Sequence, residues 1–130
     1  MLSLYLLLTS LTFNLDENLL KALITTETTN KCDLSSHCYL ISSTKDIGLL
    51  QINLKYSGVH NLEMLYNNET NLHLAGGRLS EYKQRLNSRE NWWVSYNVGV
   101  TGFRKLKYPN KHPYAIKTLK HYKSNVKEAI

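Results

Sequence analysis

The sequence predicts a mainly α-helical protein with one domain. Apolar residues recur every three to four positions in three segments, 19–24, 72–86 and 115–126, as they do along the buried face of a helix. With 130 residues, of which 42% are hydrophobic, the chain is large enough for one core. No stretch approaches the roughly 20 apolar residues of a membrane-spanning helix.

The chain is basic, with 16 Lys and Arg against 10 Asp and Glu and a formal charge of +6. This balance favours an anionic partner, which is an acidic polymer such as cell wall, a membrane surface or a nucleic acid. The basic residues from Arg104 to Lys127 are spread along a predicted loop and helix. We interpret them as an ordinary solvated face.

Residues 1–13 are apolar and uncharged. The segment lacks the positive start of a secretory signal, and no small-residue cleavage site follows it. We therefore expect a first helix that packs on the core, with an uncleaved or truncated export signal as the alternative. Residues 14–130 form the rest of the domain.

A second helix is expected from near Asn14 to Glu27. Asn14 suits the N-cap position, and Glu17 stands three residues later, where its side chain can reach back to the cap. Asp16 and Glu17 lie in the first turn, where negative charge complements the helix dipole. We assign both acids a structural role.

Glu27 continues the apolar stripe of this helix, because it lies four residues after Leu23 and three after Ile24. A carboxyl group on that stripe is partly desolvated. Desolvation raises its pKa toward the range in which a general acid works near neutral pH. A helix-end glutamate that caps neighbouring backbone is the alternative interpretation.

Polar and turn-forming residues between Asn30 and Thr44 predict a loop. The loop contains Cys32 and Cys38, and two states stay open for them: a disulfide formed in an oxidising compartment, or two free thiols. His37 stands beside Cys38, but no second ligand pair follows at a useful spacing. We therefore expect no metal and no other cofactor.

Three further helices are expected. The segment 71–86 predicts a packing helix, with Glu81 and Arg85 paired on its solvent side and small residues at 76–77 that let another helix approach. Residues 92–98 predict a short helix that Gly99 ends in a left-handed cap.

The last helix opens at His112-Pro113, since proline favours the first helical position. Its buried face is expected to consist of Ala115, Ile116, Leu119, Tyr122 and Val126.

Four motifs follow one another along the chain: Glu27-Thr28, Asp46-Ile-Gly-Leu-Leu-Gln-Ile-Asn53, Tyr96-Asn-Val-Gly99 and a late Tyr122. Each motif is weak, but the ordered set resembles the lysozyme-like lytic transglycosylases over roughly residues 14–126. The second motif is most similar to that of the small enzymes that accompany type III and type IV secretion systems, pili and phage particles. The resemblance makes residues 14–130 a lysozyme-like transglycosylase domain.

The resemblance implies an α+β, lysozyme-like fold, in which residues 39–52 form a short β-hairpin that walls a glycan-binding cleft. Gly48 in this wall permits a positive φ or a close backbone approach. Gln51 can offer both a donor and an acceptor to an acetamido sugar.

The resemblance also implies the roles of the site residues. Glu27 is the catalytic acid and base, and no second catalytic carboxylate is needed. The expected substrate-binding residues are Thr28, Asp46, Leu50, Gln51, Tyr96, Asn97 and Tyr122, with Tyr122 near the glutamate and Asp46 as a cleft or loop-bracing residue.

The implied reaction cleaves the bond between N-acetylmuramic acid and N-acetylglucosamine and forms a 1,6-anhydro sugar, with help from the substrate's acetamido group. Two alternatives stay open. Asp46 also matches the second carboxylate of animal c-type lysozymes, so a muramidase can hydrolyse the same bond with Glu27 and Asp46. A catalytically idle glycan- or DNA-binding component of a phage particle or secretion machine is the other alternative.

The expected partner is the peptidoglycan glycan strand, and a nucleic acid is not expected. Such an enzyme acts in the periplasm or cell-wall space, exported or delivered with a phage particle. There it opens the wall locally for a secretion or conjugation machine or for phage genome entry.

Overall fold

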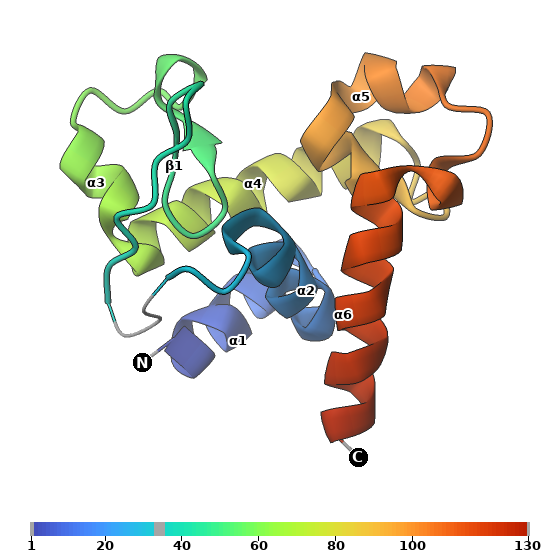
Figure 1. Ribbon diagram of the computed structural model, residues 1–130, viewed down its shortest axis with the longest axis horizontal. Helices are drawn as coiled ribbons and strands as arrows, with labels where there is room; N and C mark the ends of the chain where they lie inside the picture. Colours follow the sequence, from blue (N-terminus) through green and yellow to red (C-terminus); the bar gives the residue numbers. More distant parts are fainter. Residues whose placement is uncertain (1, 33–35, 130) are drawn as a thin grey trace.

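The computed structural model of the protein describes residues 2–32 and 36–129, and it confirms a mainly α-helical domain with one short hairpin (Figure 1). The helices are α1 (Leu2–Phe13), α2 (Glu17–Thr28), α3 (Leu62–Tyr66), α4 (Asn68–Arg85), α5 (Ser95–Lys105) and α6 (Pro113–Ala129). The strands β1 (Asp46–Ile47) and β2 (Ile52–Asn53) pair antiparallel. Short 3-10 turns cover Leu54–Tyr56, Trp92–Val94 and Pro109–Lys111.

Helix α2 lies in the middle of the molecule, between the lobe that carries the hairpin and α3 and the lobe that carries α5 and α6 (Figure 1). Its N-cap is Asp16, whose carboxylate accepts hydrogen bonds from the backbone N–H groups of Asn18 at 2.8 Å and Leu19 at 3.3 Å. The prediction of Asn14 as the cap is wrong. Asn14 adopts a left-handed φ of 53° in the turn before the helix.

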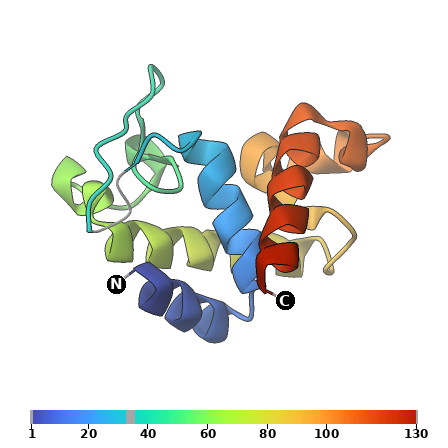
Figure 2. The ribbon, with the colours of Figure 1, turned by 60° about the horizontal axis from the view of Figure 1, so that its bottom comes forward.

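Helices α2 and α6 pack side by side and run antiparallel (Figures 1 and 2). The hydroxyls of Thr26 and Thr118 are 2.8 Å apart in the buried interface, and at the other end Asn125 Nδ2 donates to the carbonyl of Asn18 at 3.2 Å. The first turn of α6 therefore meets the last turn of α2. Helix α6 begins at Pro113 as predicted, but Ile116 is 59% exposed and does not belong to its buried face.

Helix α1 lies along α4 (Figure 2). A Cβ atom at Gly76 would come within 2.7 Å of the Phe13 and Thr9 side chains, which confirms that this small residue lets another helix approach. Leu6 is buried in the core, whereas the other face of α1 is open to solvent. No helix within the described ranges has the length and apolar character needed to cross a membrane.

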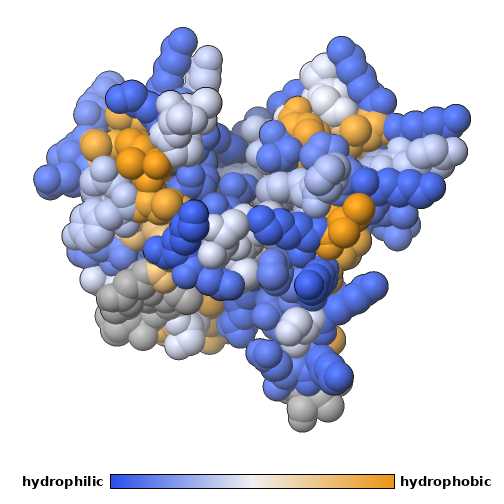
Figure 3. All heavy atoms as spheres, viewed as in Figure 1, coloured by the Kyte–Doolittle hydropathy of each residue, from blue (hydrophilic) through white to orange (hydrophobic). Residues whose placement is uncertain are grey.

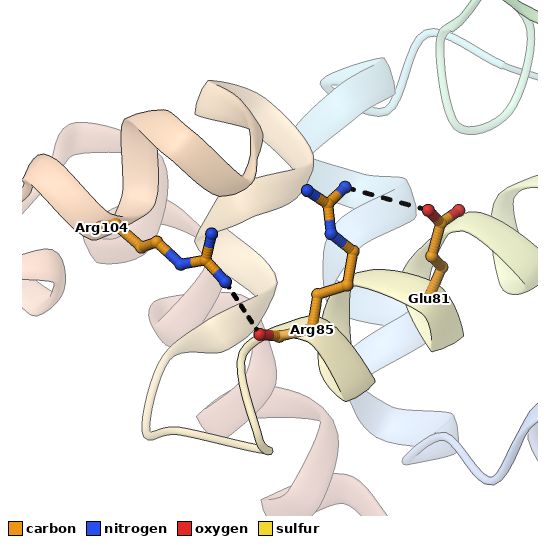
Figure 4. A network of polar contacts seen from close by, with 3 residues as sticks. All are labelled: Glu81, Arg85 and Arg104. Carbon is orange, nitrogen blue, oxygen red and sulfur yellow. Dashed lines mark hydrogen bonds and ion pairs between the residues drawn. The ribbon is translucent and has the colours of Figure 1, made fainter.

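Helix α4 starts at Asn68, three residues before the predicted start, and its expected ion pair is present, with Arg85 and Glu81 3.9 Å apart (Figure 4). Arg104 donates to the carbonyl of Arg85 at 3.1 Å and so ties α5 to the end of α4. Gly99 interrupts the helix with a positive φ, as predicted, but its φ of 78° and ψ of 166° make a kink and not a left-handed cap. A second helical segment follows the kink, and α5 as a whole extends to Lys105.

The hairpin pairs Asp46 with Asn53 and Ile47 with Ile52. Before it, a disulfide joins Cys32 to Cys38, so of the two states left open by the sequence the structure has the bridged one. The backbone N–H of Cys38 donates to the carbonyl of Tyr66 at 2.8 Å, which ties this loop to the end of α3. Positions 33–35 of the predicted loop lie outside the described residues.

Candidate active site

Glu27 lies in the last turn of α2, half-buried between the two lobes. Tyr114 Oη, from the first turn of α6, donates a hydrogen bond to Glu27 Oε2 at 2.7 Å. Burial raises the pKa of Glu27 from 4.5 to about 7, and the charge of Asp46 also raises it; the Tyr114 hydrogen bond and the Lys117 charge act in the opposite direction. Near neutral pH this carboxyl group can therefore both give and take a proton.

Glu27 lines a pocket of about 340 Å³. The pocket is built by the end of α2, the first turn of α5 and the first turn of α6. Its other lining residues are Thr26, Asn97, His112, Pro113, Tyr114 and Lys117. Figure 3 shows the molecule hollowed between the hairpin lobe and the α5–α6 lobe.

Asp46 stands at the start of β1 and accepts hydrogen bonds from three side chains. Ser42 Oγ is 3.1 Å from one carboxylate oxygen, which also accepts from the Thr44 hydroxyl, and Asn53 Nδ2 is 3.1 Å from the other oxygen. Donors on both oxygens suit an anionic acceptor. Asp46 thus braces the hairpin, and its charge still acts on Glu27.

Tyr96 holds the hairpin turn against α5, because its Oη donates to the carbonyl of Leu50 at 2.5 Å. Burial, followed by the charge of Glu27, raises the pKa of this phenol, so it stays protonated and keeps donating. Leu50 therefore contacts Tyr96 through its backbone carbonyl, and the Leu50 side chain is buried.

Gln51 turns inward with a left-handed φ of 49°. Its Nε2 donates to the carbonyl of Gly48 at 2.9 Å and to that of Leu40 at 3.3 Å. The expectation that Gln51 offers a sugar both a donor and an acceptor needs correction, because both amide hydrogens hold the turn. Its carboxamide oxygen accepts from no group in the described residues and is the part that can meet a ligand.

Asn71 was not singled out from the sequence, yet it organises this wall. It is fully buried; its side chain accepts from the N–H of Leu50 at 2.9 Å and donates to the carbonyls of Ile47 and Leu65, both at 2.8 Å. Gly48 has φ 77°, and a Cβ atom there would collide with the Leu65 carbonyl oxygen and the Asn71 amide. The sequence did contain a sign of this role, because Asn71 stands at the start of the predicted apolar stripe of 71–86. An amide that is buried there must find hydrogen-bond partners in neighbouring segments.

The two other predicted binding residues of this region differ in their access to the pocket. Asn97 is exposed and lines the pocket beside Glu27. Thr28 is only 2% exposed, and its hydroxyl donates to the carbonyl of Ile24 at 2.9 Å within α2. The structure thus uses the Thr28 hydroxyl inside its own helix.

Tyr122 does not lie near Glu27, and its predicted position was wrong. Its Oη donates to Asp16 Oδ2 at 2.8 Å, at the opposite end of α2. Because α2 and α6 are antiparallel, a residue eight positions further along α6 lies ~12 Å further from the end of α2. Tyr114 takes the expected place, and the signal for it was its position directly after Pro113, in the turn that meets the end of α2.

The comparison with protein families agrees with this arrangement. The family model described as the transglycosylase SLT domain matches residues 7–120, which is most of the chain. Comparison with curated proteins and with solved structures found no match. The chain therefore belongs to the transglycosylase SLT domain family, whose members are lytic transglycosylases that act on peptidoglycan.

Proposed function

We propose that this lytic transglycosylase cleaves the β-1,4 bond between N-acetylmuramic acid and N-acetylglucosamine and leaves a 1,6-anhydro end on the muramic acid. The observation that carries the proposal is Glu27 itself, a half-buried carboxyl group on a pocket wall with a pKa of about 7. One residue must act first as an acid and then as a base in this reaction. A pKa close to the working pH suits both steps.

In the first step the Glu27 carboxyl gives its proton to the glycosidic oxygen, and the bond from that oxygen to C1 of the muramic acid breaks. The acetamido oxygen of the same sugar bonds to C1 and takes up the positive charge. In the second step the 6-hydroxyl oxygen attacks C1 and displaces the acetamido oxygen, while the Glu27 carboxylate removes the hydroxyl proton. The proton is back on Glu27 at the end, and no water is consumed.

Tyr114 supports Glu27 in both steps. Its hydrogen bond of 2.7 Å orients the carboxyl group and stabilises the anion that exists between the two proton transfers. We assign glycan contacts to Asn97 in the pocket and to the Gln51 carboxamide oxygen in the hairpin wall. Tyr96 and Leu50 hold that wall at the cleft, and Thr28 supports the end of α2.

A second candidate function is hydrolysis of the same bond by a muramidase, and Asp46 is the observation that favours it. Its carboxylate faces three donors, and its charge raises the pKa of Glu27. Two carboxyl groups in unlike surroundings, one protonated and one ionised, are the arrangement used by hydrolytic glycosidases. In that case Asp46 acts on water or on C1, and the product carries a reducing end.

Product mass separates the two reactions. Purified sacculi are digested, the released muropeptides are reduced with borohydride, and their masses are measured. An anhydro product is lighter than the hydrolytic product by one water and does not take up hydrogen on reduction, because it has no reducing end. Reducible products would replace the proposal with hydrolysis, and Glu27→Gln is the control that must release neither.

We further propose that the enzyme works in the periplasm or cell-wall space and opens the wall locally for a secretion or conjugation machine or a phage. The Cys32–Cys38 disulfide supports an oxidising compartment, and the charge of +6 supports contact with an acidic polymer. Fractionation of producing cells with thiol labelling tests this. Reduced protein confined to the cytosol would contradict it.

A further inference from the structure

The positive charge of the chain is concentrated at its C-terminal end. Of the 16 basic residues, eight come before residue 104 and eight from residue 104 on, whereas nine of the ten acidic residues come before residue 104. Glu128 is the only acid after residue 90. The first 103 residues are thus almost neutral in sum, and the end of α5, the following loop and α6 carry the net charge.

On α6 these residues share one face. Lys117, Lys120, Lys123 and Lys127 are all exposed, while Tyr114, Ala115 and Thr118 on the other side are buried toward α2. We name these four lysines the cationic face. It extends for ~15 Å along the helix, and hydrophilic residues cover much of the region of α6 seen in Figure 3.

No ion pair among the described residues involves this face, and its one interaction with an acid in the site is the mutual effect of the Lys117 and Glu27 charges. Within residues 2–32 and 36–129 the only ion pair joins Arg85 to Glu81, and Arg104 is engaged with the carbonyl of Arg85 (Figure 4). Burial lowers the pKa of His121, and the positive charges of Lys117 and Lys120 lower it further. Like charges three or four residues apart destabilise a helix, and a bound anion offsets this repulsion.

The cationic face begins at the catalytic pocket, because Lys117 lines that pocket with Glu27. A glycan strand whose scissile bond lies at Glu27 brings its peptide stems, which end in carboxylates, beside the first lysine. Resting on the proposed function, we propose that the cationic face binds free carboxylates of the peptide stems, so that the enzyme prefers peptidoglycan with unamidated stems. The pocket's continuity with the face favours this partner over a nucleic acid.

The test measures binding without cleavage, in the full chain with Glu27→Gln. One variant adds Lys120→Glu with Lys123→Glu, and the matched control adds Lys21→Glu with Lys31→Glu, two exposed lysines outside α6. Each pair of substitutions lowers the formal charge by four. The probes are native sacculi and sacculi whose carboxylates have been amidated with carbodiimide and ammonia.

We expect the α6 variant to bind native sacculi about fivefold more weakly, equivalent to about 1 kcal/mol, and the control to change less than twofold. The difference should shrink with added salt and vanish on amidated sacculi. Circular dichroism melting checks that both variants fold; if the reversed pair does not, Lys120→Gln with Lys123→Gln replaces it, with Gln in the control as well.

Equal weakening in both variants, or equal binding to native and amidated sacculi, would overturn the proposal. A DNA duplex that displaces the protein more effectively than soluble muropeptides would identify a nucleic acid as the partner instead. Because the catalytic glutamate is already replaced, these results do not depend on which bond the enzyme cuts. The product mass from the unmodified protein tests that separately.

Discussion

Tyr114 Oη donates to Glu27 Oε2 at 2.7 Å, and this bond joins the first turn of α6 to the last turn of α2. The two residues are 87 positions apart in the chain. The contact sets the orientation of the carboxyl group and favours its ionised form. The α2–α6 interface therefore positions the carboxyl group that we propose as the catalytic acid and base.

Replacing Tyr114 by Phe should lower kcat about 10- to 100-fold, since a hydrogen bond to a charged group contributes about 1.5–3 kcal/mol. The pKa of Glu27 should rise, because the bond that lowers it is lost. Clearing of purified sacculi measured across pH checks both effects. The matched control is Tyr122→Phe, which breaks the bond to Asp16 at the far end of α2 and should leave kcat unchanged. Loss of activity in the control alone would reverse the two assignments.

Glu27→Gln should abolish clearing of sacculi without lowering Tm. The pKa of Glu27 is about 7 in the folded protein and 4.5 in the unfolded chain. The contribution of this group to the free energy of unfolding is therefore fully present below pH 4.5 and is lost as the pH rises through 7. Removing the ionisable group should therefore stabilise the protein at pH 8 by up to about 3 kcal/mol relative to its effect at pH 4. Thermal melts of both proteins at the two pH values measure this. If Glu27→Gln is less stable than the unmodified protein at pH 8, burial of the ionised Glu27 carboxylate does not destabilise the folded state.

The rate should fall with a midpoint near pH 7 on the alkaline side, because the acid must be protonated to cleave. In Asp46→Asn the midpoint should move to lower pH, since a negative charge that raises the pKa of Glu27 is removed. If the enzyme is a transglycosylase, the Asp46→Asn variant stays active, and its rate shows the shifted pH dependence. Complete loss of turnover in a folded Asp46→Asn protein would favour the muramidase mechanism.

Asn71→Ala should destabilise the protein by about 3 kcal/mol, because three buried hydrogen bonds are lost and their backbone partners stay behind. In a domain of this size we expect Tm to fall by about 10 °C. Exposed Asn97→Ala is the control and should change Tm little while weakening substrate binding. A fall in Tm for Asn71→Ala as small as that of the control would contradict the role of Asn71.

Ser95→Ala should stabilise the protein by about 1 kcal/mol. The Ser95 hydroxyl is completely buried and finds no hydrogen-bond partner among the described residues, so its removal relieves a desolvation cost. Denaturant titration measures the change. A loss of stability would mean that a bound water satisfies this hydroxyl.

Local sequence pattern was enough to predict much of the fold and the place of Glu27 on the apolar stripe of α2. Glu27 continues the stripe of Leu23 and Ile24, Pro113 starts α6, and Gly76 admits α1, because each depends on spacing within one helix or on the size of one residue. The order of the four motifs along the chain was enough to predict the family.

The partners of the acid depended on how distant segments meet. Tyr114 and Tyr122 both lie on α6, and only the antiparallel register against α2 selects Tyr114 for Glu27 and Tyr122 for Asp16. The role of Asn71 likewise depends on tertiary packing, because α4 must lie against the hairpin before the Asn71 side chain can reach the backbone of Leu50 and Ile47. A helical pattern states which face of a helix is buried but not which residue of another helix lies opposite, because that register is set by the packing of the whole core.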